Sequence, residues 1–318
     1  MAQKIPNYIV TMMADRGWRM AHYVWHEVRN MWLFYDEPTR QALRNLGWEP
    51  PRPARELGPN NRPRPILNND SGEDFLYMHR EMIRAVNERL AGDVNYPRVV
   101  GWSSLPAPGD ADYPVPPAWD TGDADFNDYL NTVKSDGAFD SQFKPWQAQY
   151  TDTNFLKSVS LGELGARIEF TIHNQMHMRF CAEPSTGIRP DADPTDPAGI
   201  DAKWDKPEYD WLGDTYSSHV NSTFWKLHGW VDDRITAWAA ANSVTDIQWK
   251  GTWLGKMPSQ PVAFSFLTVM AERAGAIKSA ESSHSHHHGH VEELQRIVRL
   301  IAGTGKFCHF YDRMELPG

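Results

Sequence analysis

Proline-rich stretches divide this chain of 318 residues and limit where regular structure can form. Six prolines lie between residues 50 and 65, where they remove backbone hydrogen-bond donors and are expected to exclude helices and strands. Residues 96–119 and 185–207 are also rich in proline, glycine or aspartate. We therefore expect long irregular loops in these three segments, and loops of this length in a compact domain often surround a functional site.

Four long segments between these loops carry apolar residues at helical spacing. Val24 and Val28 lie one turn apart in the first segment, and Phe224, Leu227 and Val231 share one face of the last. The pattern predicts one mainly α-helical domain over residues 1–318, built on a central antiparallel four-helix bundle with long irregular loops. The bundle helices are expected at about 7–35, 73–91, 168–181 and 217–242.

Shorter elements are expected elsewhere in the chain. Helices are predicted at 39–46, within 123–161, at about 266–277 and at 291–301, and one or two strands within 252–265. Residues from about 252 to 318 form a C-terminal extension in this interpretation.

The charge balance argues against a protein whose main task is to bind nucleic acid or an anionic membrane. There are 32 Lys and Arg against 41 Asp and Glu, a formal net charge of -9, and no dense basic run. No apolar stretch reaches the ~18 residues of a membrane span, and the N-terminal residues lack the order of regions in a signal peptide. We therefore expect a cytoplasmic protein without nucleic-acid or membrane partners.

Histidine spacing gives the main functional signal. His22 and His26 are four residues apart on a predicted helix and share a face, so both can bind one metal ion. His173 and His177 repeat this spacing in the other half of the chain. Single histidines in apolar helical segments follow each pair, at His79 and His228. Four helices thus offer two possible three-histidine sites.

Each of these histidines also has an ordinary interpretation as a core residue, because one HxxxH pair often arises by chance. Two pairs, each followed by a further histidine, are harder to attribute to chance. The chain lacks HExxH, and its one Glu-x-x-His, Glu281 to His284, lies in a low-complexity run. Cys181 and Cys308 are too far apart for a CxxC motif, so sulfur ligands are not expected. Imidazole-only sites suit copper, zinc, iron and nickel, and two adjacent ones suit a copper pair.

The segment 221–232, NSTFWKLHGWVD, resembles the second copper-site motif of tyrosinases, D-P-x-F-aromatic-x-x-H-x-x-x-D. Phe224, Trp225, His228 and Asp232 coincide with it, whereas Asn-Ser replaces Asp-Pro. The segment 173–177, HNQMH, is similar to the H-N-x-x-H of the same site, and residues 75–80, FLYMHR, are similar to the family's F-L-x-W-H-R.

This resemblance implies a type-3 copper protein with two copper ions per chain in a dinuclear site. His173, His177 and His228 would bind one ion, with Asp232 as the expected acceptor for the second N–H of His228. The family places a further ligand about nine residues before His79, where this chain has Asn69 or Asp70. We therefore expect His22, His26 and His79 to bind the first ion, an arrangement similar to the HxxxH-then-His pattern of arthropod hemocyanins and insect phenoloxidases.

The implied activity is oxidation of phenols by dioxygen, with hydroxylation of monophenols as well as oxidation of catechols to quinones. Asn174 and Glu169, or Glu163, are expected to hold a water that takes up the phenol proton, and the alternative for Asn174 is a cap or bridge within its helix. Two other functions remain open: a copper-deficient accessory or binding protein, and a dioxygen carrier. The expected partners are a small phenol and dioxygen, with a copper chaperone or a second copy of the chain as further possibilities.

The remaining histidines receive no catalytic assignment. Residues 284–290, HSHHHGH, have a Ser/Gly context that predicts a flexible solvated loop, and the alternative is an arm that delivers copper. His219 and His309 are interpreted as ordinary residues, and Cys181 as a buried apolar thiol.

Overall fold

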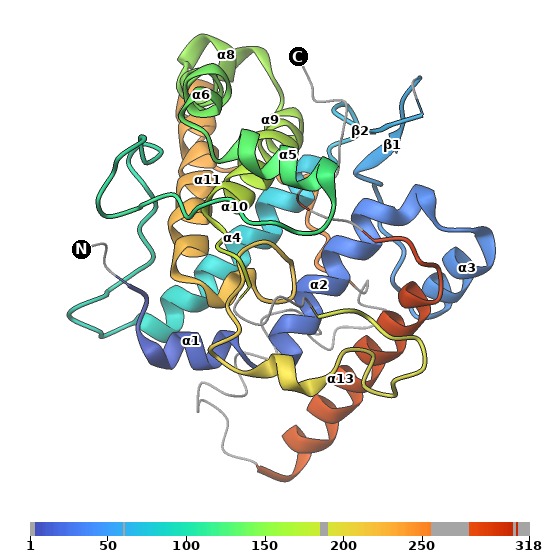
Figure 1. Cartoon of the computed structure of the whole chain (residues 1–318). Helices are drawn as coiled ribbons and strands as arrows, with labels where there is room; N and C mark the ends of the chain where they lie inside the picture. Colours follow the sequence, from blue (N-terminus) through green and yellow to red (C-terminus); the bar gives the residue numbers. More distant parts are fainter. Residues whose placement is uncertain (1–3, 60, 185–189, 256–279, 308–309, 311–318) are drawn as a thin grey trace.

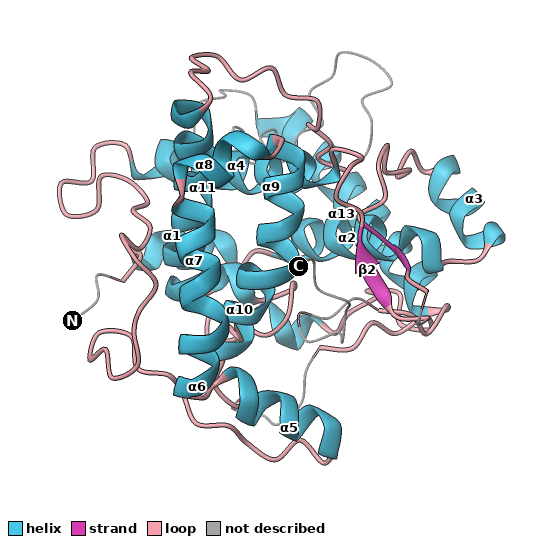
Figure 2. Cartoon of the chain, turned by 90° about the horizontal axis from the view of Figure 1, so that it is seen from above, coloured by secondary structure: helices cyan, strands magenta, loops and turns pink. Residues whose placement is uncertain are grey.

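A computed structural model describes residues 4–59, 61–184, 190–255, 280–307 and 310. Within these residues the molecule is mainly helical and has a single two-stranded sheet, which confirms the predicted mainly α class (Figure 1). Irregular segments run around the outside of the helices (Figure 2). None of the described helices is both long enough and apolar enough to cross a membrane.

The predicted helix at 7–35 is interrupted in the structure. It comprises α1 (Asn7–Met13), α2 (Arg16–Met31) and the 3-10 helix η1 (Trp32–Phe34). Asp15 causes the break, because its side chain accepts a hydrogen bond from the backbone N–H of Gly17 and so starts α2 as an N-cap. Both histidines of the first pair lie on α2.

The expectation that residues 50–65 contain no regular structure is wrong. Helix α3 (Glu37–Asn45) is followed by β1 (Arg55–Leu57) and β2 (Pro63–Pro65), which pair antiparallel with Glu56 opposite Arg64. An isolated two-stranded sheet accepts proline because each strand has an open edge where no donor is required.

The other three predicted bundle segments correspond to helices with shifted ends. Helix α4 is Ser71–Leu90, and helix α11 is Ser222–Ala241, preceded by the 3-10 turn η5 (Ser218–Val220). Between them, α9 (Leu161–Ile168) continues through the π-helical turn η3 (Glu169–His173) into α10 (Asn174–Phe180). Single π-helical turns within α-helices are frequent at functional sites, and this one places His173 at the junction of η3 and α10.

The expected short helices within 123–161 are present, and residues 96–119 are irregular as predicted. The structure gives them as α5 (Ala124–Val133), α6 (Asp136–Ala138), η2 (Phe139–Phe143), α7 (Lys144–Thr151) and α8 (Thr153–Ser158). The loop at 190–217 contains only the 3-10 turn η4 (Ala202–Asp205).

The prediction of a loop at residues 284–290 is wrong, because α13 (Ala280–Ala302) runs through them. Serine and histidine are only moderately unfavourable in helices, so a helix stabilised further along can extend through such a run. The stabilising part is the predicted amphipathic segment, whose Leu294, Ile297, Val298 and Ile301 are fully buried. The predicted helix at 266–277, most of the segment 252–265, and His309 lie outside the described residues.

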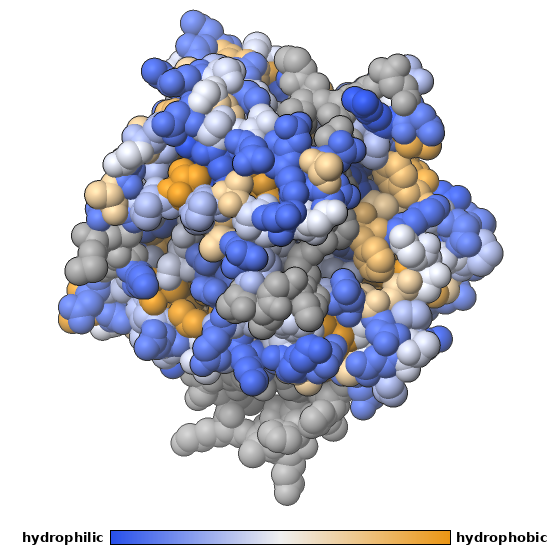
Figure 3. Space-filling model, in the orientation of Figure 1, coloured by the Kyte–Doolittle hydropathy of each residue, from blue (hydrophilic) through white to orange (hydrophobic). Residues whose placement is uncertain are grey.

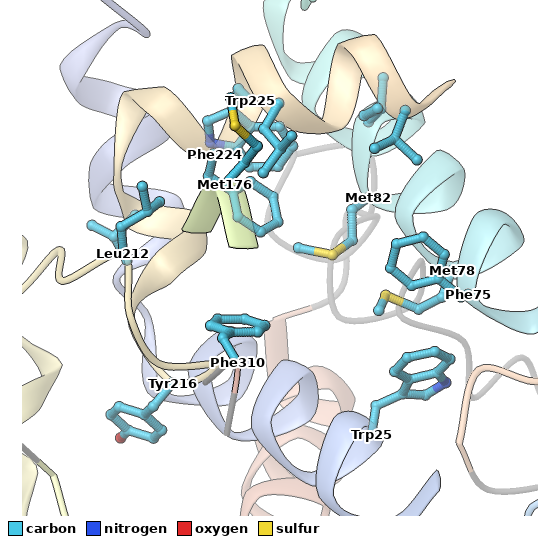
Figure 4. Packing of buried hydrophobic residues seen from close by; sticks show 14 of the residues in the cluster. Trp25, Phe75, Met78, Met82, Met176, Leu212, Tyr216, Phe224, Trp225 and Phe310 are labelled. Atoms are coloured by element: carbon cyan, nitrogen blue, oxygen red, sulfur yellow. The ribbon is translucent and has the colours of Figure 1, made fainter. Parts of the chain in front are cut away.

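The core is formed by aromatic, methionine and aliphatic side chains from all parts of the described chain. Figure 4 shows side chains from α2, α4 and α11 and the side chain of Phe310 pointing into one interior. The face in Figure 3 is mostly hydrophilic, with apolar residues in small separate patches.

A buried ion pair joins three helical segments around the histidines. The guanidinium of Arg29 on α2 forms two hydrogen bonds with the carboxylate of Glu169 in η3, with N–O distances of 2.7 and 2.9 Å. Both side chains are at most 1% exposed, and Arg29 also donates to the carbonyl oxygen of Ser71 on α4 at 2.6 Å. Such bidentate pairs restrict orientation as well as distance, so this contact fixes how the three segments approach one another.

Glycines set the distance between α4 and α9. A Cβ atom at Gly72 would overlap the backbone nitrogen of Ala166 and the carbonyl oxygen of Gly162, and one at Gly165 would overlap the carbonyl oxygen of Gly72. The two backbones are therefore in direct contact. Because α4 carries His79 and α9 continues into the segment with His173, this contact also sets the spacing of the two histidine groups.

We expect Gly72→Ala to lower the free energy of unfolding by about 2 kcal/mol, because the helices must move apart to admit the methyl group. Gly137→Ala is the control, since a Cβ there meets no atom closer than the Ser135 Oγ, 3.7 Å away, and alanine is favoured over glycine in a helix. Urea denaturation of both variants tests this. Equal stability of the two would contradict the close contact.

Candidate metal centre

The structure brings together all six histidines singled out from the sequence. They lie on α2, α4, α11 and the η3–α10 segment, and each is at most 2% exposed. The ring centroids of His22 and His26 are 4.8 Å apart, and those of His79 and His228 are 4.4 Å apart with the rings stacked. The six imidazoles therefore form one continuous buried cluster.

His22, His26 and His79 form the first trio. Each offers a ring nitrogen within 4.8 Å of those of the other two. The Nε2 atoms of all three are buried and have no hydrogen-bond partner within the described part of the chain. Buried polar atoms without partners are rare in native proteins, so three in one place fit a site that could hold a metal ion.

His173, His177 and His228 form the second trio. The Nε2 of His173 lies 3.0 Å from that of His228 and 3.2 Å from that of His177. Another set of three histidines overlaps both trios: the ring nitrogens of His79, His173 and His228 also lie within 4.8 Å of one another. His79 thus lies between the two trios. The set with three mutually close ring nitrogens contains His79 rather than the predicted His177, whose Nε2 lies close to that of His173.

Hydrogen bonds at Nδ1, the ring nitrogen other than Nε2, orient most of these histidines. Four Nδ1 atoms lie within hydrogen-bond distance of backbone carbonyl oxygens: His22 with Thr215 (2.6 Å), His79 with Phe75 (2.9 Å), His177 with Leu212 (2.9 Å) and His228 with Phe224 (2.8 Å). A carbonyl oxygen only accepts hydrogen bonds, so each Nδ1 carries the hydrogen. In a neutral ring Nε2 then presents its lone pair, as in metal-bound histidines.

The imidazoles of both trios are neutral near pH 7. Burial lowers the pKa of His22 to about 3 and that of His173 to about 4. Burial likewise holds the pKa values of the other four well below the ordinary value of histidine. In the second trio, the Nε2 lone pairs of His177 and His228 therefore both face the Nε2 of His173.

The spacing in the second trio suits a shared metal cation. Nitrogen ligands about 2.0 Å from a tetrahedral metal ion lie about 3.3 Å from one another. The observed separations of 3.0 and 3.2 Å are close to this value. The separations of His173 from its two neighbours thus suit ligands of one metal ion, with His173 between His177 and His228.

The expected partnership between Asp232 and His228 is wrong. Asp232 instead pairs with Arg80 at 2.7 Å and is partly exposed. The carbonyl of Phe224, one turn before His228, takes the Nδ1–H, and a helix supplies such a carbonyl at every position. Sequence patterns single out side chains, so these backbone partners were missed.

Asn174 and Glu169 lie beside the second trio, but each has defined partners. The Oδ1 of Asn174 lies 2.9 Å from the Nδ1 of His173, which places Asn174 on the outer side of that ring. The Glu169 carboxylate is bound by Arg29 and lies 3.3 Å from the amide nitrogen of Asn30. Both contacts orient neighbouring groups, and the water-holding role expected of these residues stays a prediction.

A cavity of about 200 Å³ is lined by residues that contact the cluster, but by none of its six histidines. Its lining includes Tyr23, Glu27, Thr215 and Phe310. The ring of Phe310 stacks on His177 with centroids 4.1 Å apart and 18° between the planes. An aromatic ring from the C-terminal part of the chain thus covers one face of a second-trio histidine.

The chain matches no protein-family profile and no curated protein sequence. A functional assignment therefore depends on the residues of the cluster and on the motif likeness described above.

We expect the metal-free protein to lose stability as the pH falls from about 6.5 toward 4. The unfolded chain takes up protons on these histidines in this range while the folded chain does not, so each costs about 1.4 kcal/mol per pH unit. Urea denaturation between pH 7 and 5 measures the slope. His173→Asn should give a shallower slope, and identical slopes would contradict the neutral buried state of His173.

Proposed function

We propose that this protein is a type-3 copper oxidoreductase of the tyrosinase kind. His22, His26 and His79 bind one copper ion and His173, His177 and His228 bind the other, within an antiparallel bundle of the helices that carry them. The observation that carries the proposal is the convergence of six buried neutral imidazoles, with unpaired Nε2 atoms in the first trio and facing Nε2 atoms in the second.

Two adjacent all-histidine trios, together with the likeness of residues 221–232 to a copper-site motif, favour copper over other metals. Histidine-only coordination suits copper, zinc, iron and nickel, but structural zinc sites usually have four protein ligands, and non-haem iron oxygenases include a carboxylate. The nearby carboxylate of Glu169 is bound by Arg29, which removes it as a ligand. Copper would supply the one-electron redox steps and the binding of dioxygen.

The protein's own residues orient ligands, exclude water and admit the substrate. The carbonyls of Thr215, Leu212, Phe75 and Phe224 hold the rings, and complete burial keeps bulk water from the cluster. The adjoining cavity is smaller than the ~300–1,000 Å³ typical of sites for drug-sized ligands. If a substrate reaches His177 through this cavity by displacing the ring of Phe310, the volume favours a phenol with a single ring.

Copper loading tests this function. Protein loaded anaerobically with Cu(I) should contain roughly two ions per chain, develop a near-ultraviolet absorption band on exposure to air, and oxidise a catechol. His228→Ala should reduce the content to roughly one ion and abolish turnover, because it removes a second-trio ligand. A copper content unchanged in His228→Ala would contradict the assignment.

The same experiment separates the two alternatives. A dioxygen carrier would give the absorption band and reverse it under vacuum without turning over catechol. An accessory protein would bind one ion or none. This proposal includes a phenolic substrate. It also includes a copper chaperone or a second copy of the chain as possible partners.

Asn174→Ala tests the proton-transfer role proposed for this side chain. Hydroxylation of a monophenol requires loss of the phenol proton, whereas catechol oxidation is less demanding, so we expect monophenol turnover to fall far more than catechol turnover. Both rates are measured per bound copper, because loss of the acceptor for His173 should also weaken copper binding about tenfold. Asn174→Asp keeps the acceptor and is the control. An equal fall in both rates would reduce Asn174 to an orienting residue.

A further inference from the structure

His219 is a seventh buried histidine and contacts the first trio from outside. It lies in η5, immediately before α11, and is fully buried. Its Nδ1 is 3.2 Å from the Nδ1 of His22, and its Nε2 is 3.1 Å from the carbonyl oxygen of Met13, the last residue of α1. No sequence pattern singles it out, because it belongs to no pair of histidines four residues apart on a helix.

The hydrogen positions in this contact follow from the acceptors. The carbonyl of Met13 requires the hydrogen of His219 on Nε2, and the carbonyl of Thr215 requires that of His22 on Nδ1. With its hydrogen on Nε2, the ring of His219 leaves Nδ1 as an acceptor that faces the Nδ1–H of His22. The lone pair on its Nδ1 then accepts from His22, which shares one hydrogen between Thr215 and His219.

We infer that His219 is a positioning residue that holds His22 ready to bind the first copper ion. The inference rests on the proposed function and adds a residue to it. Two acceptors on one Nδ1–H fix both the tautomer and the rotation of the His22 ring, so that Nε2 points toward the other two histidines of its trio. Outer partners of this kind typically change metal affinity by about 10–100-fold.

His219 also has a purely structural contact, and two substitutions separate the roles. In His219→Asn the side-chain oxygen replaces Nδ1 and keeps an acceptor for His22, but the donor to Met13 is lost. In His219→Gln the amide nitrogen replaces Nε2 and keeps the donor to Met13, but the acceptor for His22 is lost. Circular dichroism and thermal melting of the copper-free variants show whether each one folds.

Cu(I) affinity, measured anaerobically by competition with a chromogenic chelator, is the readout. It is measured in a His228→Ala background, so that the first trio dominates. We expect His219→Gln to weaken binding at least about tenfold and His219→Asn to retain most of it. In a His26→Ala background, where the second trio remains, neither substitution should change the affinity.

Each outcome decides the inference. Unchanged affinity in His219→Gln, or a loss in His219→Asn greater than in His219→Gln, overturns it and leaves only the contact with Met13. An equal loss in both backgrounds also overturns it, because the effect is then not specific to His22. If the unsubstituted chain binds no copper, the proposed function itself fails, whatever the His219 variants do.

Discussion

The meeting of six uncharged imidazoles in the buried interior is the constraint on which the rest of the structure depends. Burying a polar ring without hydrogen-bond partners is unfavourable. Carbonyl oxygens around the cluster offset part of this penalty by accepting the Nδ1–H groups of four of the rings. The surrounding helices and loops must therefore position the rings and also the carbonyl groups that accept hydrogen bonds from them. The buried pair of Arg29 and Glu169 and the glycine contact between α4 and α9 contribute to this positioning.

Much of the histidine cluster can be predicted from the sequence, because the spacing of residues along a helix determines which side chains share a face. Two histidines four residues apart on one helix share a face whatever the tertiary structure is, so both pairs were predictable. The single histidines His79 and His228 lie in apolar helical patterns that assign them to the core. Convergence of four helices on one point was a further hypothesis, and the structure places the rings within contact of one another.

Other features depend on contacts that carry no sequence signal. A backbone carbonyl is present at every residue, so nothing distinguishes Leu212 or Thr215 as an acceptor until the loop is folded. His219 stands alone in the sequence and gains its contact only from the packing of η5 against α1 and α2. The break before α2 was visible in principle, since Asp15 is a good N-cap, but the apolar periodicity on both sides of it concealed the boundary.

The loop before η5 serves both halves of the centre. Leu212 holds His177 of the second trio, and Thr215, three residues later, holds His22 of the first. Asp214 closes the turn between them by accepting from the backbone N–H and the hydroxyl of Ser217, each at 2.7 Å. The orientations of His177 and His22 therefore both depend on this one segment of the chain. If the proposed copper ions bind at both trios, a shift of this segment caused by one ion also reaches the other, and by linkage any such coupling acts equally in both directions.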